Sequence, residues 1–379
     1  MRLATFNVEN LFDRPKIMNL PKWSDGQKVL DDYKELTTLI QKDTYSAADK
    51  ARMKVLIARY KLHDRRAKHE FIQLRDNRPK LLQSHKDGSF DIVANGRGGW
   101  VGWVELTTGS ITDTTGNITA LELQNTGRVI AEVNPDILVL VEIDNRIALS
   151  RFNTQVVTPQ LAQKALPPYA HNMLIDGNDE RGIDIGILSR FPIASMRSHI
   201  DERLPGGTKP VFARDCPEYY LDLGNGKTFV LLANHFSSQG GGAAAATWRG
   251  QQAARVRELY QGLVGAFPNI AVLGDLNAPP TEKPNVSLAP LLSNTNLQDV
   301  MSLPQYTETT LPGTFHYCNA QDKLDYILLP PALVATVTAV GVERRGIYVA
   351  KKWKPFDTVT DATSGASDHG CLWVDLTAV

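Results

Sequence analysis

The stretch VLGDLNAPP, residues 272–280, places a carboxylate and an amide directly after a run of apolar residues. The apolar run, 271–273, is typical of the end of a buried strand. Gly, Asp, Asn and Pro favour a turn for backbone reasons. Asp275 and Asn277 at the end of a strand also provide the groups that a metal–phosphate site needs. By itself the stretch fits both interpretations.

The composition indicates a globular protein of balanced charge, since 41 Lys and Arg residues stand against 41 Asp and Glu residues. Any polyanion must therefore bind at a local basic patch. The three cysteines form no CxxC motif, which favours a reducing compartment. The N-terminus lacks the features of a signal peptide, and no apolar run approaches the ~20 residues of a membrane span. We expect a cytoplasmic protein, although a secreted form whose leader has been removed would have the same sequence.

Apolar segments and amphipathic segments alternate along most of the chain, which predicts a single α/β domain over residues 1–379. The expected strands are residues 2–8, 136–144, 182–190, 323–330, 337–344 and 367–376, with a hairpin over 218–236 and a helix over 249–264. A segment of different composition is inserted into this pattern at about residues 13–127.

The insertion is basic, with 12 Lys and Arg against 3 Asp and Glu between Lys50 and Lys86. Residues 28–76, including AKHEFIQL at 67–74, are predicted to be mostly helical, and residues 95–106 to form a hairpin. The charge fits either a solvated helix face or a surface that holds a nucleic-acid strand. In the second case Lys and Arg bind phosphates, and Trp100 and Trp103 stack on bases.

Six predicted strands end in, or are interrupted by, a polar group that can bind a metal or a phosphate. These groups are Asn7, Glu142, His235, Asp275 with Asn277, Asp325, and Asp368 with His369. Each has an ordinary explanation, such as a solvated side chain or a capped turn. Their recurrence at equivalent places predicts that the strand ends meet in one polar cluster.

The residue types in this cluster suit the hydrolysis of a phosphate ester with a divalent cation. Mg²⁺ takes oxygen ligands and keeps several waters, so one or two carboxylates suffice, and Mn²⁺ or Ca²⁺ can take the same place. Attack on phosphorus needs a positioned water and neutralised oxygens. A His–Asp pair supplies an oriented imidazole near neutral pH. The amides of Asn7, Asn234 and Asn277 can donate to phosphate oxygens without adding charge.

Seven motifs occur in the order and approximate spacing of the endonuclease/exonuclease/phosphatase superfamily, which the sequence resembles and which includes proteins similar to DNase I and exonuclease III. They are FNVEN, LVLVEIDN, RGIDIGILSR, ANHFSS, VLGDLNAPP, KLDYILL and SDHG. The resemblance covers residues 1–12 and about 127–379. It implies a four-layer αββα sandwich, in which two mixed β-sheets pack face to face between helices.

The resemblance also implies roles for the metal-binding residues. Glu142 would be the main Mg²⁺ ligand, Asn7 would lie beside it and orient metal and water, and Asp368 would be a further carboxylate of the metal site.

The catalytic roles follow from the same resemblance. Asp275 would position or deprotonate the attacking water, with His369 as the other candidate base. Asn277 would hold the phosphate, and His235 would hydrogen-bond one of its oxygens. Asp325 would orient His369.

The sequence departs from the family in two places. Gly182 stands where abasic-site endonucleases of the exonuclease III type carry a tyrosine, which disfavours abasic-site repair. Arg181 is a candidate phosphate contact there, or else the partner of Asp184 in a surface pair. Ser237 and Ser238 stand where bacterial relatives often carry a lysine.

The predicted function is that of a metal-dependent phosphodiesterase, foremost a nuclease acting on DNA or RNA. The alternative is a phosphatase or phosphodiesterase acting on a small or lipid phosphate, such as an inositol phosphate or sphingomyelin. A binding module without activity is disfavoured, because the metal-binding and catalytic residue types are all present. The sequence implies no protein partner.

Overall fold

The computed structural model describes residues 1–20, 22–64, 66–76, 80–97, 100–110, 120–282, 287–349 and 352–377. The chain divides into two compact units. The larger consists of Met1–Phe12 and Ala120–Val379, and the smaller of Asp13–Thr119. The insertion predicted at about 13–127 thus covers the smaller unit and extends into the first helix of the larger one.

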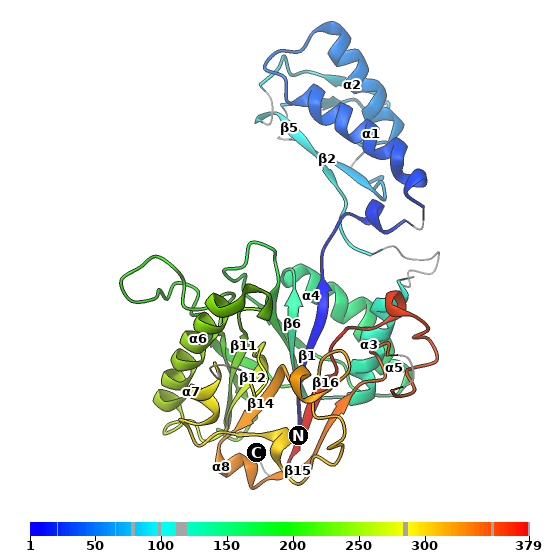
Figure 1. Ribbon diagram of the computed structural model, residues 1–379. Helices are drawn as coiled ribbons and strands as arrows, with labels where there is room; N and C mark the ends of the chain where they lie inside the picture. Colours follow the sequence, from blue (N-terminus) through cyan, green and yellow to red (C-terminus); the bar gives the residue numbers. More distant parts are fainter. Residues whose placement is uncertain are drawn as a thin grey trace. The chain divides into compact units, whose positions relative to one another are not determined.

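Two six-stranded mixed sheets form the centre of the larger unit (Figure 1). The first has the order β15 (Val337–Glu343), β16 (Cys371–Leu376), β1 (Arg2–Leu11), β6 (Ile137–Ile143), β8 (Asp184–Ser189) and β7 (His171–Leu174). The second has the order β13 (Gln298–Asp299), β14 (Asp325–Leu329), β12 (Ile270–Asp275), β11 (Thr228–His235), β10 (Glu218–Asp222) and β9 (Ile193–Arg197). The pairs β1–β6 and β11–β12 are parallel, and the other pairs are antiparallel.

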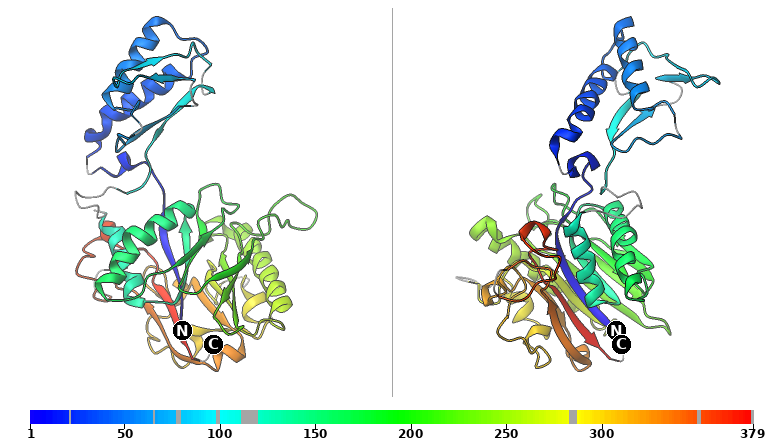
Figure 2. Two further views of the ribbon diagram at one scale, coloured as in Figure 1. Left: turned by 180° about the vertical axis from the view of Figure 1, so that it is seen from behind. Right: turned by 90° about the vertical axis from the view of Figure 1, so that its right-hand side faces the viewer.

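Helices cover the outer faces of the two sheets (Figure 2). Against the first sheet lie α3 (Leu121–Val133), α4 (Arg146–Phe152) and α5 (Thr158–Gln163), with a π-helical turn at Asn153–Val157. Against the second lie α6 (Gly242–Leu263) and α7 (Ala289–Leu292), and α8 (Pro331–Val334) follows β14. Short 3-10 turns occur at Gln239–Gly241, Val300–Ser302, Ala320–Asp322 and Ala362–Ser364. This is the predicted four-layer αββα sandwich. In the described part of the chain, no helix is both long enough and apolar enough to cross a membrane.

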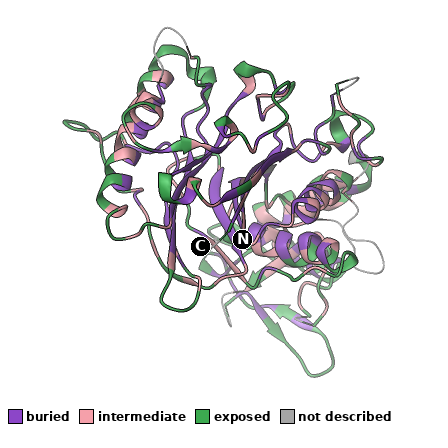
Figure 3. Cartoon of the chain, turned by 90° about the horizontal axis from the view of Figure 1, so that it is seen from below, coloured by how far each residue is buried: buried purple, intermediate pink, exposed green. Residues whose placement is uncertain are grey.

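The central strands of the larger unit are buried along most of their length (Figure 3). Side chains that alternate along these strands divide the apolar core into layers. In β11, Leu231 and Ala233 pack between the two sheets, whereas Val230 and Leu232 pack against α6. Strands buried on both faces in this way are apolar at nearly every position. A polar residue inside such a strand therefore points either between the sheets or toward the helices, according to its place in the alternation.

The smaller unit has its own apolar core. Its helices α1 (Trp23–Ile40) and α2 (Ala47–Arg59) pack with two two-stranded sheets, β2 (Ile72–Asp76) with β5 (Gly102–Leu106) and β3 (Leu82–Ser84) with β4 (Phe90–Ile92), and a 3-10 turn occupies Lys16–Asn19. A capping box begins α2, because the Ser46 hydroxyl accepts from the backbone N–H of Asp49, whose carboxylate in turn accepts from the backbone N–H of Ser46.

Two predictions for this unit are wrong. The sequence predicts a helix over residues 67–74, but Ile72–Asp76 is a strand. Its ladder partner is β5, about 30 residues further along the chain. A short apolar run fits the period of a helix as well as that of a strand, so the local pattern did not distinguish them. The prediction of a hairpin within residues 95–106 is also wrong, because the strand Gly102–Leu106 pairs with β2 and not with a neighbouring segment of 95–106. Gly98 and Gly99 lie outside the described residues.

Gly274 lets β12 approach its neighbour where the polar residues begin. It has φ +128°, and a Cβ atom there would lie 2.0 Å from the carbonyl oxygen of Asn234 on β11. Only glycine fits this position, on both backbone and contact grounds.

We therefore predict that Gly274→Ala lowers the free energy of unfolding by about 3 kcal/mol or more. The backbone strain of an alanine at this φ adds to the steric overlap of its Cβ atom with the Asn234 carbonyl. Gly224→Ala, in the β10–β11 turn at φ +81° with open space around it, is the matched control and should cost about 1 kcal/mol. Denaturant unfolding measures both, and equal losses would contradict the close approach at Gly274.

Candidate active site

Three neighbouring strands bring His235, Asp275 and Asp325 side by side. In the ladders, His235 lies opposite Asp275 and Asp275 lies opposite Asp325. All three share the alternation of the residues that pack between the sheets, and all three are buried. This end of the second sheet therefore points an imidazole and two carboxylates toward the first sheet.

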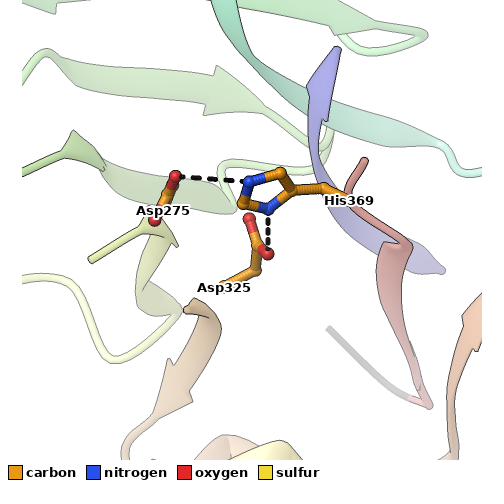
Figure 4. Close-up of side chains that lie close together, drawn as sticks. All are labelled: Asp275, Asp325 and His369. Carbon is orange, nitrogen blue, oxygen red and sulfur yellow. Dashed lines mark hydrogen bonds and ion pairs between the residues drawn. The ribbon is translucent and has the colours of Figure 1, made fainter. Parts of the chain in front are cut away.

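His369 comes from the first sheet, just before β16, and lies between the two carboxylates (Figure 4). Its Nδ1 is 2.7 Å from Asp325 Oδ2, and its Nε2 is 4.0 Å from Asp275 Oδ2. The Thr314 hydroxyl donates to Asp325 Oδ2 over 2.6 Å. Asp325 thus orients the His369 ring, and Thr314 fixes Asp325.

The pKa values of this group differ strongly from those of free side chains. Burial lowers the pKa of His369, but the charge and hydrogen bond of Asp325, together with Asp275, outweigh it and raise the pKa to about 10. Burial, then the charge of Asp325, raises the pKa of Asp275 to about 7, against the opposing effect of His369. At neutral pH, His369 is a cation and Asp275 can exchange a proton.

Asn7 joins the two carboxylates that come from different sheets. Its Nδ2 donates to Asp275 Oδ2 over 3.1 Å and lies 3.2 Å from Glu142 Oε1. Glu142 Oε1 is also 3.8 Å from His235 Nε2. Asn7 and Glu142 on the first sheet thereby meet Asp275 and His235 on the second.

A backbone irregularity aims Glu142 at this cluster. In β6, Ile137, Val139 and Val141 pack between the sheets, so simple alternation would turn residue 142 toward the helices. The ladder to β8 shifts register between Val141 and Ile143, and Glu142 has φ +71°. A bulge of this kind re-aims a side chain, and the strained backbone is of the sort that concentrates at functional sites.

Asp368 lies at the rim of the cluster. Its Oδ1 is 3.8 Å from His369 Nε2, and its backbone N–H donates to Glu9 Oε2 over 2.9 Å. Burial, then the charge of Asp368, raises the pKa of Glu9. Ser367 ties this segment to β1, because its hydroxyl donates to the Asn7 carbonyl over 2.7 Å.

A buried arginine supplies positive charge near His235. Arg214 Nη1 donates to the Phe236 carbonyl over 2.8 Å, and its Nε lies 3.0 Å from Asp179 Oδ2. Burial, then the charge of Arg214, lowers the pKa of His235 well below its usual value. His235 is therefore a neutral imidazole at physiological pH.

Of the three residues predicted to bind substrate phosphate, Asn277 contacts this close group, because its backbone N–H donates to Asp275 Oδ1 over 2.8 Å. Asn277, with φ +53°, donates its Nδ2 to the Phe236 carbonyl over 3.1 Å. Asn234 points with Leu232 toward α6 and donates to the Leu232 carbonyl. Arg181 is largely exposed and pairs with Asp179, not with Asp184, which accepts from the backbone N–H of Gly177.

Sequence reasoning missed Glu9, Arg214 and Thr314. Glu9 stands inside the FNVEN motif, two residues after Asn7, so the strand period was a usable signal. Arg214 lies between β9 and β10, in a segment without a periodic pattern, and Thr314 lies in a loop. No local sequence signal marks these two.

The donor set fits a hard divalent cation. Glu142 and Asp275 offer carboxylate oxygens beside Asn7, and Asp368 adds a carboxylate at the rim, 3.8 Å from His369 Nε2. A carboxylate oxygen of Asp275 and one of Asp325 also lie within 4.8 Å of each other. Asp325 Oδ1 is buried without a hydrogen-bond partner among the described residues. Several carboxylates with so little compensating charge are what an oxygen-coordinated cation offsets.

The sequence model of the endonuclease/exonuclease/phosphatase family matches residues 109–369, more than half of the chain. The chain belongs to this family. Its members are typically phosphoesterases, and they generally use a divalent metal. A comparison with curated proteins finds no match.

Solved structures resemble the chain at low identity. An endonuclease/exonuclease/phosphatase from Beutenbergia cavernae DSM 12333 is 19% identical to this chain, with a TM-score of 0.48. The match covers 67% of this chain and 65% of that one, which is less than two thirds of that protein. A mannosyl-6-phosphatase from Bacteroides thetaiotaomicron VPI-5482 is 17% identical with a TM-score of 0.47, over 71% and 96%. Truncated TDP2 from Caenorhabditis elegans is 16% identical with a TM-score of 0.44, over 69% and 92%.

We predict that Mn²⁺ or Mg²⁺ binds about tenfold more tightly at about pH 8 than at about pH 6, because the cation competes with the proton that Asp275 holds up to a pKa of about 7. The folded pKa lies above the ordinary value of 3.8, so the folded protein keeps this proton into the neutral range. Between these two pH values His369 stays charged and His235 stays neutral. Neither histidine therefore reverses the expected rise of metal affinity with pH. Calorimetric titration measures the affinity.

Asp222→Asn, at an exposed carboxylate in the β10–β11 hairpin, should leave both affinities unchanged, and Asp275→Asn should weaken binding and remove its pH dependence. Equal affinities at the two pH values would exclude Asp275 from the metal site.

Proposed function

We propose that the protein is a metal-dependent phosphodiesterase, foremost a nuclease. The observation that carries the proposal is the meeting of Glu142, Asp275, Asp325, His235 and His369 around Asn7, at one end of the sandwich and from both sheets. Acidic oxygen ligands, a protonated imidazole and a carboxylate that titrates near neutrality are together what hydrolysis of a phosphate ester requires.

Glu142 would hold the cation, with Asn7, Asp275 and Asp368 beside it. The bound cation supplies positive charge to the phosphate oxygens and lowers the pKa of a water. Asp275, which loses its own proton when the cation binds, would accept the proton of the attacking water. His369, fixed by Asp325 and charged, would stabilise the negative charge that develops on the phosphoryl oxygens.

Neutral His235 would donate a hydrogen bond to the phosphate. Arg214 is buried against Asp179 and the Phe236 carbonyl, and it holds the segment after β11 in place. Arg181, exposed and paired with Asp179, would contact an outer phosphate. His235, Arg214 and Arg181 would thus add positive charge or hydrogen-bond donors on the side of the site away from His369.

The charge of the smaller unit supports a nucleic-acid substrate. Residues 13–119 hold 19 Lys and Arg against 14 Asp and Glu, a net charge of +5 in a chain that is neutral overall. Part of this charge is balanced locally, because Arg52, Lys54, Arg59 and Arg75 form ion pairs with acidic side chains. Trp103 is 48% exposed and is available for stacking.

A panel of substrates tests the proposal. Plasmid DNA, single-stranded DNA, RNA, an abasic duplex, inositol phosphates and bis-p-nitrophenyl phosphate are incubated with the full chain in Mg²⁺ and in EDTA. We expect cleavage of at least one nucleic acid that EDTA abolishes. Hydrolysis confined to the inositol phosphates would establish the alternative, a phosphatase of small phosphates, and no hydrolysis of any phosphodiester would overturn the proposal.

We predict that Glu142→Gln and His369→Ala each lower kcat by about 10²–10⁴-fold, because one removes a metal ligand and the other a charged donor to the phosphoryl group. Single-turnover rates on the best substrate of the panel measure the loss, and circular dichroism verifies the fold. Asp222→Asn again serves as the control with unchanged activity. Full activity of either variant would refute the assigned roles.

The smaller unit is tested through salt dependence. We predict that Arg66→Gln with Lys68→Gln, two exposed positions, weakens binding of single-stranded DNA and lowers the slope of log K against log salt by about one per lost phosphate contact. Arg65, in the same basic run, lies outside the described residues. Lys227→Gln, in the β10–β11 turn, is the control. An unchanged steep slope in the double variant would exclude this surface from substrate binding.

A further inference from the structure

A loop of aromatic residues borders the site next to His369. The loop consists of residues 313–319 and is called the aromatic rim here. The Phe315 ring lies 4.8 Å from the His369 ring, and the His316 ring lies 4.2 Å from Phe315 and 6.2 Å from Tyr317. The backbone N–H of His316 donates to the Asp368 carbonyl over 2.8 Å. The three rings thus lead from the catalytic histidine outward.

The outer part of the rim faces solvent. The side chain of His316 is 53% exposed, and Tyr317 is 56% exposed. Exposed neighbouring rings beside the proposed catalytic group form a surface on which a ligand can pack. Their π-faces suit a planar, aromatic ligand group.

The rim is held rigidly from below. Buried Arg344 donates to the carbonyls of Leu311 and Gly313, and Cys318 is fully buried in a small apolar cluster with Ile347 and Val349. His316 and Cys318 have φ of +45° and +55°, a backbone that non-glycine residues adopt only where surrounding contacts enforce it. A rigid surface loses little conformational entropy when it binds a ligand.

Lysine charge accompanies the rings. Lys352 Nζ lies 5.8 Å from the centre of the Tyr317 ring and donates to the Tyr317 carbonyl and, over 2.8 Å, to Asn319 Oδ1. An ammonium group has three donor protons, so one remains for an anion beyond these two contacts. The rim therefore offers stacking surfaces and a fixed positive charge together.

We propose that His316, Tyr317 and Lys352 form a subsite that binds a nucleobase and its adjoining phosphate next to the scissile bond. The proposal rests on the proposed function and narrows it, since it selects nucleotide substrates over sugar phosphates and inositol phosphates. A base stacks on the exposed rings, and the charge of Lys352 attracts a phosphate. His316 and Tyr317 act on binding, and His369 and Asp275 act on the chemistry.

The first test needs no catalysis. The full chain in EDTA is titrated by calorimetry with adenosine 5′-monophosphate and with ribose 5-phosphate, which differ only in the base. We expect the nucleotide to bind about tenfold more tightly, in line with the strength of one stacking contact. The double variant His316→Ala with Tyr317→Ala should remove this preference, whereas Lys352→Gln should weaken both ligands alike.

Tyr317→Phe is the matched control, because it keeps the aromatic ring and should keep the preference for the nucleotide. Tyr317→Leu keeps an apolar side chain without the ring and should reduce that preference. In a second test, Tyr317→Ala should raise KM for a dinucleoside phosphate about tenfold and leave kcat within about twofold. A residue that served only the fold would move both.

Equal affinities for the two ligands in the unaltered protein, or a preference that survives the double variant, would overturn the subsite. If the preference depends on the rim but no phosphodiester is hydrolysed, the subsite stands and the proposed activity falls. If phosphodiesters are hydrolysed without any preference for a base, the activity stands and the subsite falls.

Discussion

Asp275 and Asp325 lie opposite each other on neighbouring strands, and the repulsion between their charges is the constraint around which the site is built. Like charges that face each other across a ladder destabilise a sheet, and burial increases the cost. His369, which comes from the other sheet, offsets it by lying between the two carboxylates. Glu142 adds a third carboxylate nearby, so this end of the sandwich carries more negative charge than its histidines balance. The proposed affinity for a cation is therefore a property of the packing of the two sheets.

The strand period explains how much of the site could be predicted from the sequence. His235, Asp275 and Asp325 stand in phase with the apolar residues that pack between the sheets, so their common direction follows from alternation alone. The same rule, applied to Asn234, places that residue on the opposite face, toward α6. The layered fold was predictable for a related reason, since strands apolar at every position must be covered on both faces.

Other features depend on contacts that no local pattern encodes. Glu142 stands out of phase and reaches the cluster only through a bulge, which is a property of the ladders to its two neighbours. Arg214 and Thr314 come from irregular segments, where side-chain direction has no period. In the smaller unit, the strand at residues 72–76 is fixed by a partner about 30 residues away, so the helical period of the preceding residues misled the prediction.

The pairing of β1 with β16 has a consequence for the order in which the molecule forms. β1 (Arg2–Leu11) is an inner strand of its sheet, and one of its two neighbours, β16 (Cys371–Leu376), is synthesised long after it. The Asn7 carbonyl and the Ser367 hydroxyl that bonds to it are 360 residues apart. Contacts of such separation close late, so β1 has an unpaired apolar edge on the growing chain until β16 arrives. The smaller unit, made from one continuous segment, can fold earlier. The ladder between β1 and β16 also brings His369 to its carboxylates, which couples the closure of the first sheet to the formation of the proposed catalytic group.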